Sequence, residues 1–321
     1  MNKSDKIYVA GHTGLAGSAI LRRFKAAGFH NLVTRTHGEL DLMEQNTVAG
    51  FFAQERPQHV ILAAARVGGI LANDTQPAEF IRENLLIQTN VIHEAYAHGV
   101  KSLLFLGSSC IYPRDCPQPI REEYFLTGPL EKTNFAYAVA KIAGVEMCHA
   151  YNRQYGTSYI CVMPTNLYGS NDHFDLNSSH VLPTMVRKFH EGKLSGRPVV
   201  LWGTGAPRRE FLHADDMADA CLHILVQPPE RLGSVFPADM APLINVGCGE
   251  DLTIKELAKL IAEITGYQGK TEWDRSKPDG TPRKLLDVSR MKALGWQPRI
   301  NLRDGIREVY ERFQQAATVN Q

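Results

Sequence analysis

Residues 6–20 read KIYVAGHTGLAGSAI, and this stretch decides the fold. A short apolar run typical of a β-strand ends in three glycines spaced G-x-x-G-x-x-G, and a helix-like pattern follows. Gly11 permits a tight turn, Gly14 lets the backbone approach a diphosphate, and Gly17 lets helix and strand pack closely. The diphosphate would lie at the helix N-terminus, where free N–H groups and the helix dipole favour an anion. The alternative is a plain strand-to-helix turn, because three spaced glycines alone are weak evidence.

The first 165 residues continue this alternation of β-rich and helix-like segments. It predicts an α/β fold with a doubly wound, Rossmann-type parallel sheet that helices cover on both faces. The candidate strands are 6–10, 31–35, 59–63, 102–107 and 159–163, and the candidate helices are 14–28, 44–54, 78–98 and 134–155.

Beyond Asn166 the pattern becomes less regular, which predicts a smaller C-terminal α/β lobe. We expect a dinucleotide-binding domain over residues 1–166 and a mainly substrate-binding lobe over 167–321, with a helix near 214–226 that returns to the first domain. The other expected elements are helices at 181–191, 254–266 and 302–313 and strands at 198–202 and 244–246.

Composition excludes several classes of protein. The net charge of the 321 residues is +1, which argues against a dedicated nucleic-acid or membrane-surface binder. No apolar run reaches the roughly 18 residues that a membrane-spanning helix needs. The six cysteines form no C-x-x-C pair, so we expect reduced thiols and no metal site. The N-terminus enters a strand almost at once, without a signal peptide, and we expect a cytoplasmic protein.

A tyrosine and a lysine, Tyr137 and Lys141, lie one turn apart on the helix expected at 134–155. A phenol is a weak acid–base catalyst at neutral pH, but a cation one turn away favours the phenolate. Ser108 follows the strand expected at 102–107, where its hydroxyl can share a substrate oxygen with the tyrosine. Taken alone, the Tyr-x-x-x-Lys spacing is also common on helix surfaces.

The glycine loop, Ser108 and Tyr137-x-x-x-Lys141 together resemble the extended short-chain dehydrogenase/reductase family. Further blocks are similar to its branch that epimerises and reduces GDP-linked 4-keto-deoxysugars to form GDP-L-fucose, and these blocks extend over most of the chain. They are residues 11–14, 64–70, 106–113, 163–169, 178–181, 209–213 and 277–284.

The resemblance implies 3,5-epimerisation and 4-reduction of GDP-4-keto-6-deoxy-D-mannose to GDP-L-fucose with NADPH. Cys110 would be the base and His180 the acid that invert C3 and C5, while Tyr137, Lys141 and Ser108 hold and protonate the C4 oxygen. Without the family blocks, Cys110 would be a small buried residue and His180 a loop histidine. Two alternatives remain: another GDP-4-keto-deoxysugar, such as a colitose or deoxy-heptose intermediate, and a catalytically silent nucleotide sensor on the same fold.

The resemblance also implies the binding residues and a homodimer formed through two helices per subunit. NADP(H) would contact Gly11, His12, Thr13, Gly14, Leu15, Ala16, Gly17, Arg35, Asp41, Leu42, Leu106, Gly107, Ser108, Tyr137, Lys141, Pro164, Thr165, Asn166, Leu167 and His180. The GDP-sugar would contact Lys188, Trp202, Arg209, Asp279 and Lys284, and the choice between Arg208 and Arg209 stays open.

One departure from the family concerns the 2′-phosphate of NADP. Thr13 and His37 occupy two places where the family often has arginines, and Arg35 remains at the end of the second strand. No Asp or Glu occupies that strand end, where NAD-preferring enzymes bind the ribose 2′-hydroxyl. We therefore expect NADP with weakened selectivity.

Overall fold

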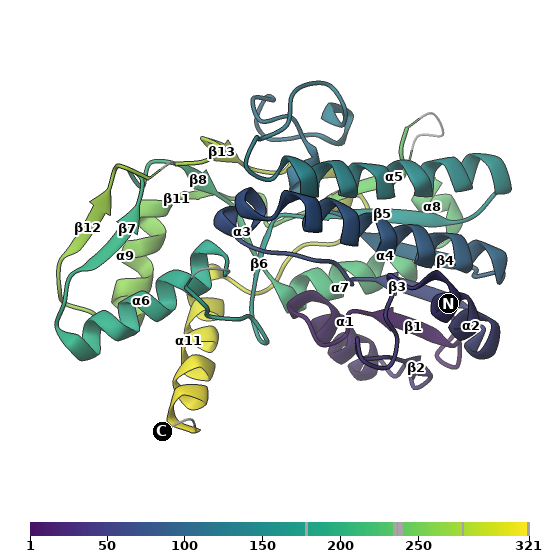
Figure 1. Ribbon diagram of the computed structural model, residues 1–321, viewed down its shortest axis with the longest axis horizontal. Coiled ribbons are helices and arrows are strands. Elements are labelled where there is room, and N and C mark those ends of the chain that lie inside the picture. Colours follow the sequence, from purple (N-terminus) through teal and green to yellow (C-terminus); the bar gives the residue numbers. More distant parts are fainter. Residues whose placement is uncertain (177–178, 234–235, 237–239, 278, 320–321) are drawn as a thin grey trace.

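The computed structural model describes residues 1–176, 179–233, 236, 240–277 and 279–319. Its centre is a six-stranded, wholly parallel sheet in the order β2-β1-β3-β4-β5-β10 (Figure 1). The order reverses at β1, and sheets of this class bind ligands at such a point, beyond the carboxyl ends of the strands. The strands are β1 (Ile7–Ala10), β2 (Leu32–Val33), β3 (His59–Leu62), β4 (Ser102–Leu106), β5 (Tyr159–Pro164) and β10 (Leu243–Val246).

Helices cover both faces of this sheet (Figure 1). One face carries α2 (Gln45–Glu55), α4 (Pro77–Ala97) and α5 (Phe135–Tyr155), and the other carries α1 (Leu15–Ala26), α7 (Ala214–Leu225) and α10 (Ser289–Ala293). Each face has its own apolar core, so every residue of β1, β3, β5 and β10 is buried. Burial on both faces explains why these strands read as continuous apolar runs.

A smaller lobe with a third apolar core lies beside the sheet (Figure 1). In it, β7 (Val199–Trp202) pairs with β12 (Thr271–Asp274), and β8 (Arg208–Arg209) lies between β11 (Leu252–Thr253) and β13 (Arg283–Lys284). The helices α6 (Val181–Ser195), α9 (Ile254–Thr265) and α11 (Leu302–Val319) complete this lobe.

A pair of short strands, β6 (Asn166–Tyr168) and β9 (Phe211–His213), forms a separate two-stranded sheet. Four further short elements lie in the loops between the main helices and strands. They are the helices α3 (Ile70–Thr75) and α8 (Pro229–Gly233) and the 3₁₀ turns η1 (Ser109–Ile111) and η2 (Glu122–Tyr124).

The structure confirms the α/β fold class and the parallel sheet, but it places one strand differently. The segment 244–246, expected in the smaller lobe, is the sixth strand of the main sheet and pairs with β5. Buried polar contacts hold it there: Tyr112 donates to the side chain of Asn245 at 2.6 Å, and the Asn245 N–H donates to Glu122 at 3.0 Å. The domain boundary at residue 166 stays a proposal. In this proposal α7, β10 and α10 belong to the dinucleotide-binding domain although they follow the boundary in the sequence.

Among the described residues, no helix combines the length and apolar character that a membrane crossing requires.

Candidate active site

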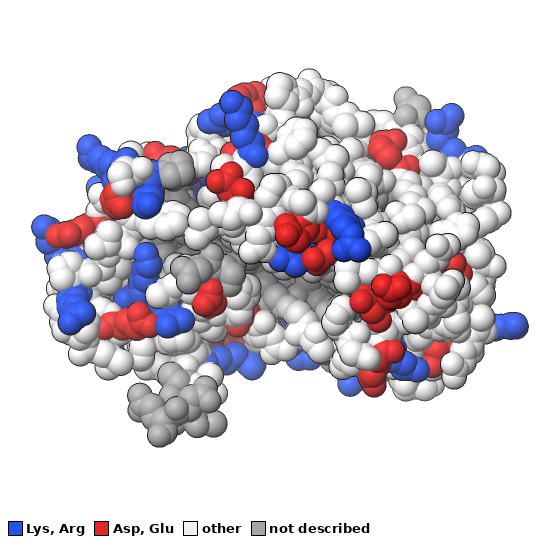
Figure 2. All heavy atoms as spheres, viewed as in Figure 1, with Lys and Arg blue, Asp and Glu red and all other residues white. Residues whose placement is uncertain are grey.

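A cavity of about 820 Å³ opens at the carboxyl ends of the sheet strands and extends to α6, β7 and β8 of the smaller lobe. Figure 2 shows this face of the molecule hollowed between the two lobes. The expected cofactor and substrate residues lie on its wall with one exception, His12. The chain therefore brings the predicted site residues together although they come from both lobes.

The glycine loop has the backbone geometry that the sequence predicts. Gly11 has φ +82°, and a Cβ on Gly17 would lie 2.0 Å from the Gly11 carbonyl oxygen. Gly14 is the N-cap of α1 and no side chain caps this helix end, while Thr13 to Ala16 line the cavity. Free N–H groups at an uncapped helix N-terminus fit the diphosphate of a dinucleotide.

His12 differs from the expectation because it does not line the cavity. Its Nδ1 is buried and has no hydrogen-bond partner among the described residues. The residues on either side of His12, Gly11 and Thr13, do line the cavity, so a direct cofactor contact by the imidazole remains a proposal.

The adenosine end of the cavity is formed by the loop after β2. Arg35 lines the cavity but also forms an ion pair with Glu55, and its guanidinium lies 5.5 Å from the Phe51 ring centre. His37 is exposed and lies 3.9 Å from the Asp41 carboxylate. An Arg that already has a carboxylate partner binds a 2′-phosphate less strongly than a free one, which agrees with weakened NADP selectivity.

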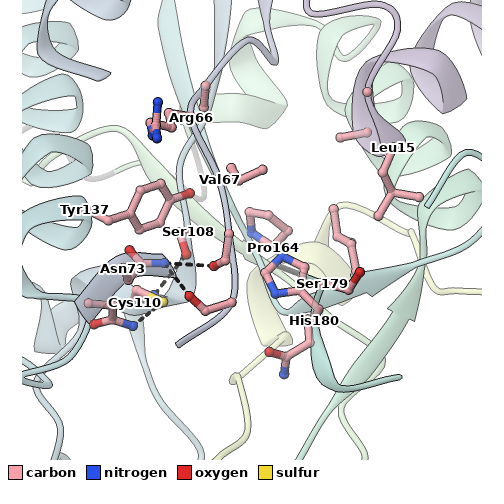
Figure 3. A pocket seen from close by; sticks show the side chains of 18 of the residues that line it. Leu15, Arg66, Val67, Asn73, Ser108, Cys110, Tyr137, Pro164, Ser179 and His180 are labelled. Carbon is pink, nitrogen blue, oxygen red and sulfur yellow. Dashed lines mark hydrogen bonds between the residues drawn. The ribbon is translucent and has the colours of Figure 1, made fainter. Parts of the chain in front are cut away.

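Ser108, Tyr137 and Lys141 meet where β4 ends and α5 begins, and Figure 3 shows Ser108 beside the Tyr137 ring. The Ser108 hydroxyl lies close enough to Tyr137 to affect the pKa of the phenol. Lys141 lies one turn further along α5, with Nζ 5.9 Å from the Tyr137 ring centre, and donates to the Leu106 carbonyl at 2.7 Å. Two hydroxyls are thus presented together to a substrate oxygen.

The electrostatics of this group differ from the sequence expectation. Burial raises the pKa of Tyr137, the neighbouring Cys110 raises it further, and the adjacent Ser108 hydroxyl acts in the opposite direction. Burial lowers the pKa of Lys141 to about 7. Because the lysine is desolvated and bonded to a carbonyl, its charge does not bring the pKa of Tyr137 down. A lysine that titrates near neutral pH can instead exchange a proton during turnover.

Cys110 lies in η1, with its thiol on the cavity wall. Two donors contact its sulfur: the Asn134 side-chain amide at 3.2 Å and the Lys284 ammonium at 3.3 Å. Its own N–H donates to Ser108 Oγ at 3.2 Å. Lys284, expected at the GDP-sugar, therefore lies at the sulfur of Cys110.

His180 lies across the cavity from Cys110 and Tyr137 (Figure 3) and is the N-cap of α6. The His180 imidazole is exposed to water through the open cavity. Protein atoms nevertheless surround much of the ring. This crowding lowers the pKa of His180, and His173 and Lys284 act in the same direction. A lowered pKa makes the imidazolium a stronger acid and reduces the fraction that is protonated at neutral pH.

The structure distinguishes the two adjacent arginines of β8. Arg208 forms an ion pair with Asp251 at 2.9 Å and is not on the cavity wall. Arg209 lines the cavity, and burial lowers the pKa of its guanidinium. Arg209 is thus the one of the pair that can reach a diphosphate.

The far end of the cavity carries the other expected substrate residues. Trp202 is 48% exposed and has the Lys277 ammonium 5.5 Å from its ring centre. The Asp279 carboxylate accepts hydrogen bonds from the Thr204 N–H at 2.7 Å and hydroxyl at 2.8 Å. Lys188 donates to a backbone carbonyl of β7 at 2.9 Å. An exposed indole and these polar groups provide a surface for a base and its ribose.

Sequence reasoning gave no role to two further parts of the wall. Residues 66–71 after β3 include Val67 and Ile70, which are 55% and 47% exposed, and Asn73 holds this loop by donating to the Gly68 carbonyl at 2.8 Å. Asn134 is the second part. The block 64–70, which follows a strand at the ligand-binding edge, was a signal for the loop; nothing in the sequence indicated Asn134.

No group of three or more potential metal ligands occurs among the described residues. The donors on the cavity wall are suited to an anionic, hydroxyl-rich ligand.

Comparison with known proteins identifies one family and similar sequences within it. The model of the NAD dependent epimerase/dehydratase family matches residues 7–236. A protein named putative GDP-L-fucose synthase 2, from Arabidopsis thaliana, is 58% identical over 312 residues, which cover 97% of this chain and 92% of the relative. The GDP-L-fucose synthase of Escherichia coli (strain K12) is 51% identical over 313 residues, 96% of each chain.

Solved structures are similar over nearly the whole chain. A GDP-6-OMe-4-keto-L-xylo-heptose reductase from C. jejuni is 39% identical, with a TM-score of 0.93 and coverage of 98% of this chain and 99% of that one. A GDP-L-fucose synthetase from Naegleria fowleri bound to NADP is 26% identical, with a TM-score of 0.87 and coverage of 99% and 96%.

Proposed function

This chain belongs to the NAD dependent epimerase/dehydratase family, and we infer that it converts GDP-4-keto-6-deoxy-D-mannose to GDP-L-fucose with NADPH. Four relatives whose names include GDP-L-fucose synthase are 51–58% identical to it over 96–97% of its length. The reaction inverts C3 and C5 and reduces the C4 ketone. One site must therefore hold a hydride donor, a polarised C4 oxygen and an acid–base pair.

The observation that carries the epimerisation is the placement of Cys110 and His180 on opposite sides of the cavity (Figure 3). A C4 ketone acidifies the protons on C3 and C5, and inversion needs a base on one face of the sugar and an acid on the other. The sulfur, contacted by an ammonium and an amide, is suited to remove a proton, and the imidazolium of low pKa is suited to deliver one.

The hydroxyl pair of Ser108 and Tyr137 would hold the C4 oxygen during both stages. Donors already directed at one point stabilise the enolate without reorganisation, and the tyrosine then protonates the C4 alkoxide. The Lys141 ammonium, with a pKa of about 7, can then return a proton to the Tyr137 phenolate. Bound NADPH supplies the hydride; the glycine loop, the N-terminus of α1 and Arg35 would hold its phosphates.

Product analysis in D₂O tests this function. The purified protein is incubated with NADPH and GDP-4-keto-6-deoxy-D-mannose, and the product is identified by NMR. We expect GDP-L-fucose with deuterium at C3 and C5. In Cys110→Ser, deuterium should enter these positions more slowly. A 4-reduced sugar with the configurations of C3 and C5 retained would show a reductase without epimerase activity, and exchange at the wild-type rate in Cys110→Ser would exclude the thiol as the base.

A second candidate substrate is another GDP-4-keto-deoxysugar, because a heptose reductase shares this fold at 39% identity. Its identity is lower than the 51–58% of the four GDP-L-fucose synthase relatives above, which favours the fucose reaction. Parallel incubations with GDP-4-keto-6-deoxy-D-mannose and a GDP-4-keto-heptose, compared by kcat/KM, decide between them.

We also propose a cytoplasmic homodimer in which α4 and α5 form the interface. These two helices pack on each other, and Tyr96, Tyr151 and Tyr155 form an aromatic cluster at their C-terminal ends. All six cysteines are free thiols, in keeping with a reducing compartment. On the face drawn in Figure 2, acidic and basic side chains are interspersed, in keeping with a small-molecule rather than a nucleic-acid partner. Light scattering of wild type and Tyr155→Lys tests the interface.

A further inference from the structure

Asn134 occupies a position where an asparagine ordinarily caps a helix. It is the N-cap residue of α5, and Asn at this position usually accepts a hydrogen bond from the N–H of the second or third helical residue. Here the side chain makes no such bond. Its amide nitrogen donates to Cys110 Sγ at 3.2 Å instead.

A carboxylate fixes the backbone on which this side chain stands. Glu131 accepts hydrogen bonds from the Asn134 N–H at 3.2 Å and from the Thr133 N–H and hydroxyl at 2.9 and 2.6 Å. Partial burial tends to raise the pKa of Glu131, but these donors lower it, so the carboxylate stays charged. The turn before α5 is thereby held with its amide directed at the sulfur.

The oxygen of the Asn134 side-chain amide lacks a hydrogen bond within the described residues. This atom, Oδ1, is buried, although a buried amide oxygen costs free energy when it is unpaired. A capping rotamer would offer this oxygen the N–H groups of Ala136 and Tyr137. The orientation observed here forgoes that bond and retains the contact with sulfur.

We propose that Asn134 is a positioning residue for the base: its amide, together with the Lys284 ammonium, holds the Cys110 sulfur toward the substrate at the expense of capping α5. This inference rests on the proposed function, in which Cys110 removes the C3 and C5 protons. The two donors come from distant parts of the chain, one before α5 and one on β13, so the sulfur is held between the sheet domain and the smaller lobe.

The test uses alkylation of Cys110 by iodoacetamide, which reports the reactivity of this sulfur independently of turnover. Cleavage after Lys101 and Arg114 releases residues 102–114, a peptide with Cys110 as its one cysteine, so mass spectrometry follows this thiol separately. In Asn134→Ala we expect alkylation at neutral pH to slow by about tenfold, since a hydrogen bond to a charged group is lost. Asn134→Asp, which can cap the helix but places a carboxylate at the sulfur, should slow it further.

A matched control is Asn301, which precedes α11 and does cap it: its Oδ1 accepts from the Asp304 N–H at 3.0 Å. Asn301→Ala should lower the thermal midpoint and leave the alkylation of Cys110 unchanged. Asn134→Asp should keep or raise the thermal midpoint while alkylation falls. If Asn134 had only a structural role, its variants would lose thermal stability while the alkylation rate of Cys110 stayed unchanged.

Deuterium exchange at C3 and C5, without NADPH, separates this proposal from the proposed function. Unchanged alkylation in both Asn134 variants overturns the positioning role, whatever the exchange rate. Slower alkylation supports it, and the exchange rate of Cys110→Ser then decides independently whether the thiol is the base. NADPH binding and circular dichroism confirm that each variant is folded.

Discussion

Replacement of Lys141 by methionine should remove a pH dependence of stability that the buried lysine creates. The side chain is 3% exposed, and its pKa is lowered from 10.5 to about 7 by burial. Lys141→Met keeps most of the length and apolar contacts and removes the titrating group. We therefore expect wild type and variant to respond differently to pH in the absence of cofactor.

The sign and size follow from proton linkage. Above pH 7 the folded protein has released the Lys141 proton, whereas the unfolded chain retains it up to the ordinary lysine pKa of 10.5. The unfolded state then binds more protons, so stability rises with pH across this window. With these two pKa values, the contribution of Lys141 to the free energy of unfolding increases by about 2 kcal/mol between pH 7 and pH 9.

Urea unfolding followed by circular dichroism at pH 7, 8 and 9 measures this contribution as the difference between wild type and variant. Other titrating groups are common to both proteins and cancel. The control is Lys259→Met, which alters an exposed lysine of α9. The difference in unfolding free energy between wild type and Lys259→Met should not change with pH. A wild-type minus Lys141→Met difference that stays constant from pH 7 to pH 9 would refute a lysine that titrates near neutral pH.

Three further perturbations address the proposed roles. Tyr137→Phe should lower turnover by roughly 10²–10⁴-fold and leave NADPH binding intact by calorimetry, since only the hydroxyl supplies the proton; near-wild-type turnover would exclude it as the donor. Arg35→Ala should raise the KM for NADPH more than that for NADH, because only NADPH carries the 2′-phosphate; equal changes would reject that contact. Gly17→Ala should abolish cofactor binding and lower the thermal midpoint, because its Cβ would lie 2.0 Å from the Gly11 carbonyl oxygen. Gly50→Ala, in an open stretch of α2, should instead stabilise by about 0.5–1 kcal/mol; a matching loss in both would show that the effect is not specific to the loop.

Features that depend on neighbours in sequence could be predicted. The glycine loop combines a short apolar run, a fixed glycine spacing and a helix, and each has a local physical cause. The pairing of Tyr137 with Lys141 follows from helix geometry alone. The predicted strands of the first half agree with the structure to within a few residues at each end.

Features that depend on distant contacts could not be predicted in this way. A four-residue apolar strand such as β10 does not indicate which sheet it joins; buried partners around Asn245 determine that. Arg208 and Arg209 are adjacent and chemically identical, and the ion pair with Asp251 distinguishes them. The contact of Lys284 with Cys110 spans 174 residues. The effect of burial on the pKa of Lys141 likewise depends on how the whole lobe packs.

The late position of β10 and α10 in the chain has a consequence for biosynthesis. The core on the α1 and α7 face joins Ile7 of the first strand to Trp296 beyond α10, so this core cannot be completed until that tryptophan has left the ribosome. At about 5–20 residues per second, the residues between β5 and Trp296 take roughly 7–26 s to synthesise. During that interval the core on the α1 and α7 face of the nascent sheet is incomplete, and one edge of β5 lacks its partner until β10 has been made. Chaperones that bind unpaired strands and apolar surface have that time to act, and a ribosome stalled before residue 243 would hold a chain whose dinucleotide-binding sheet is still one strand short.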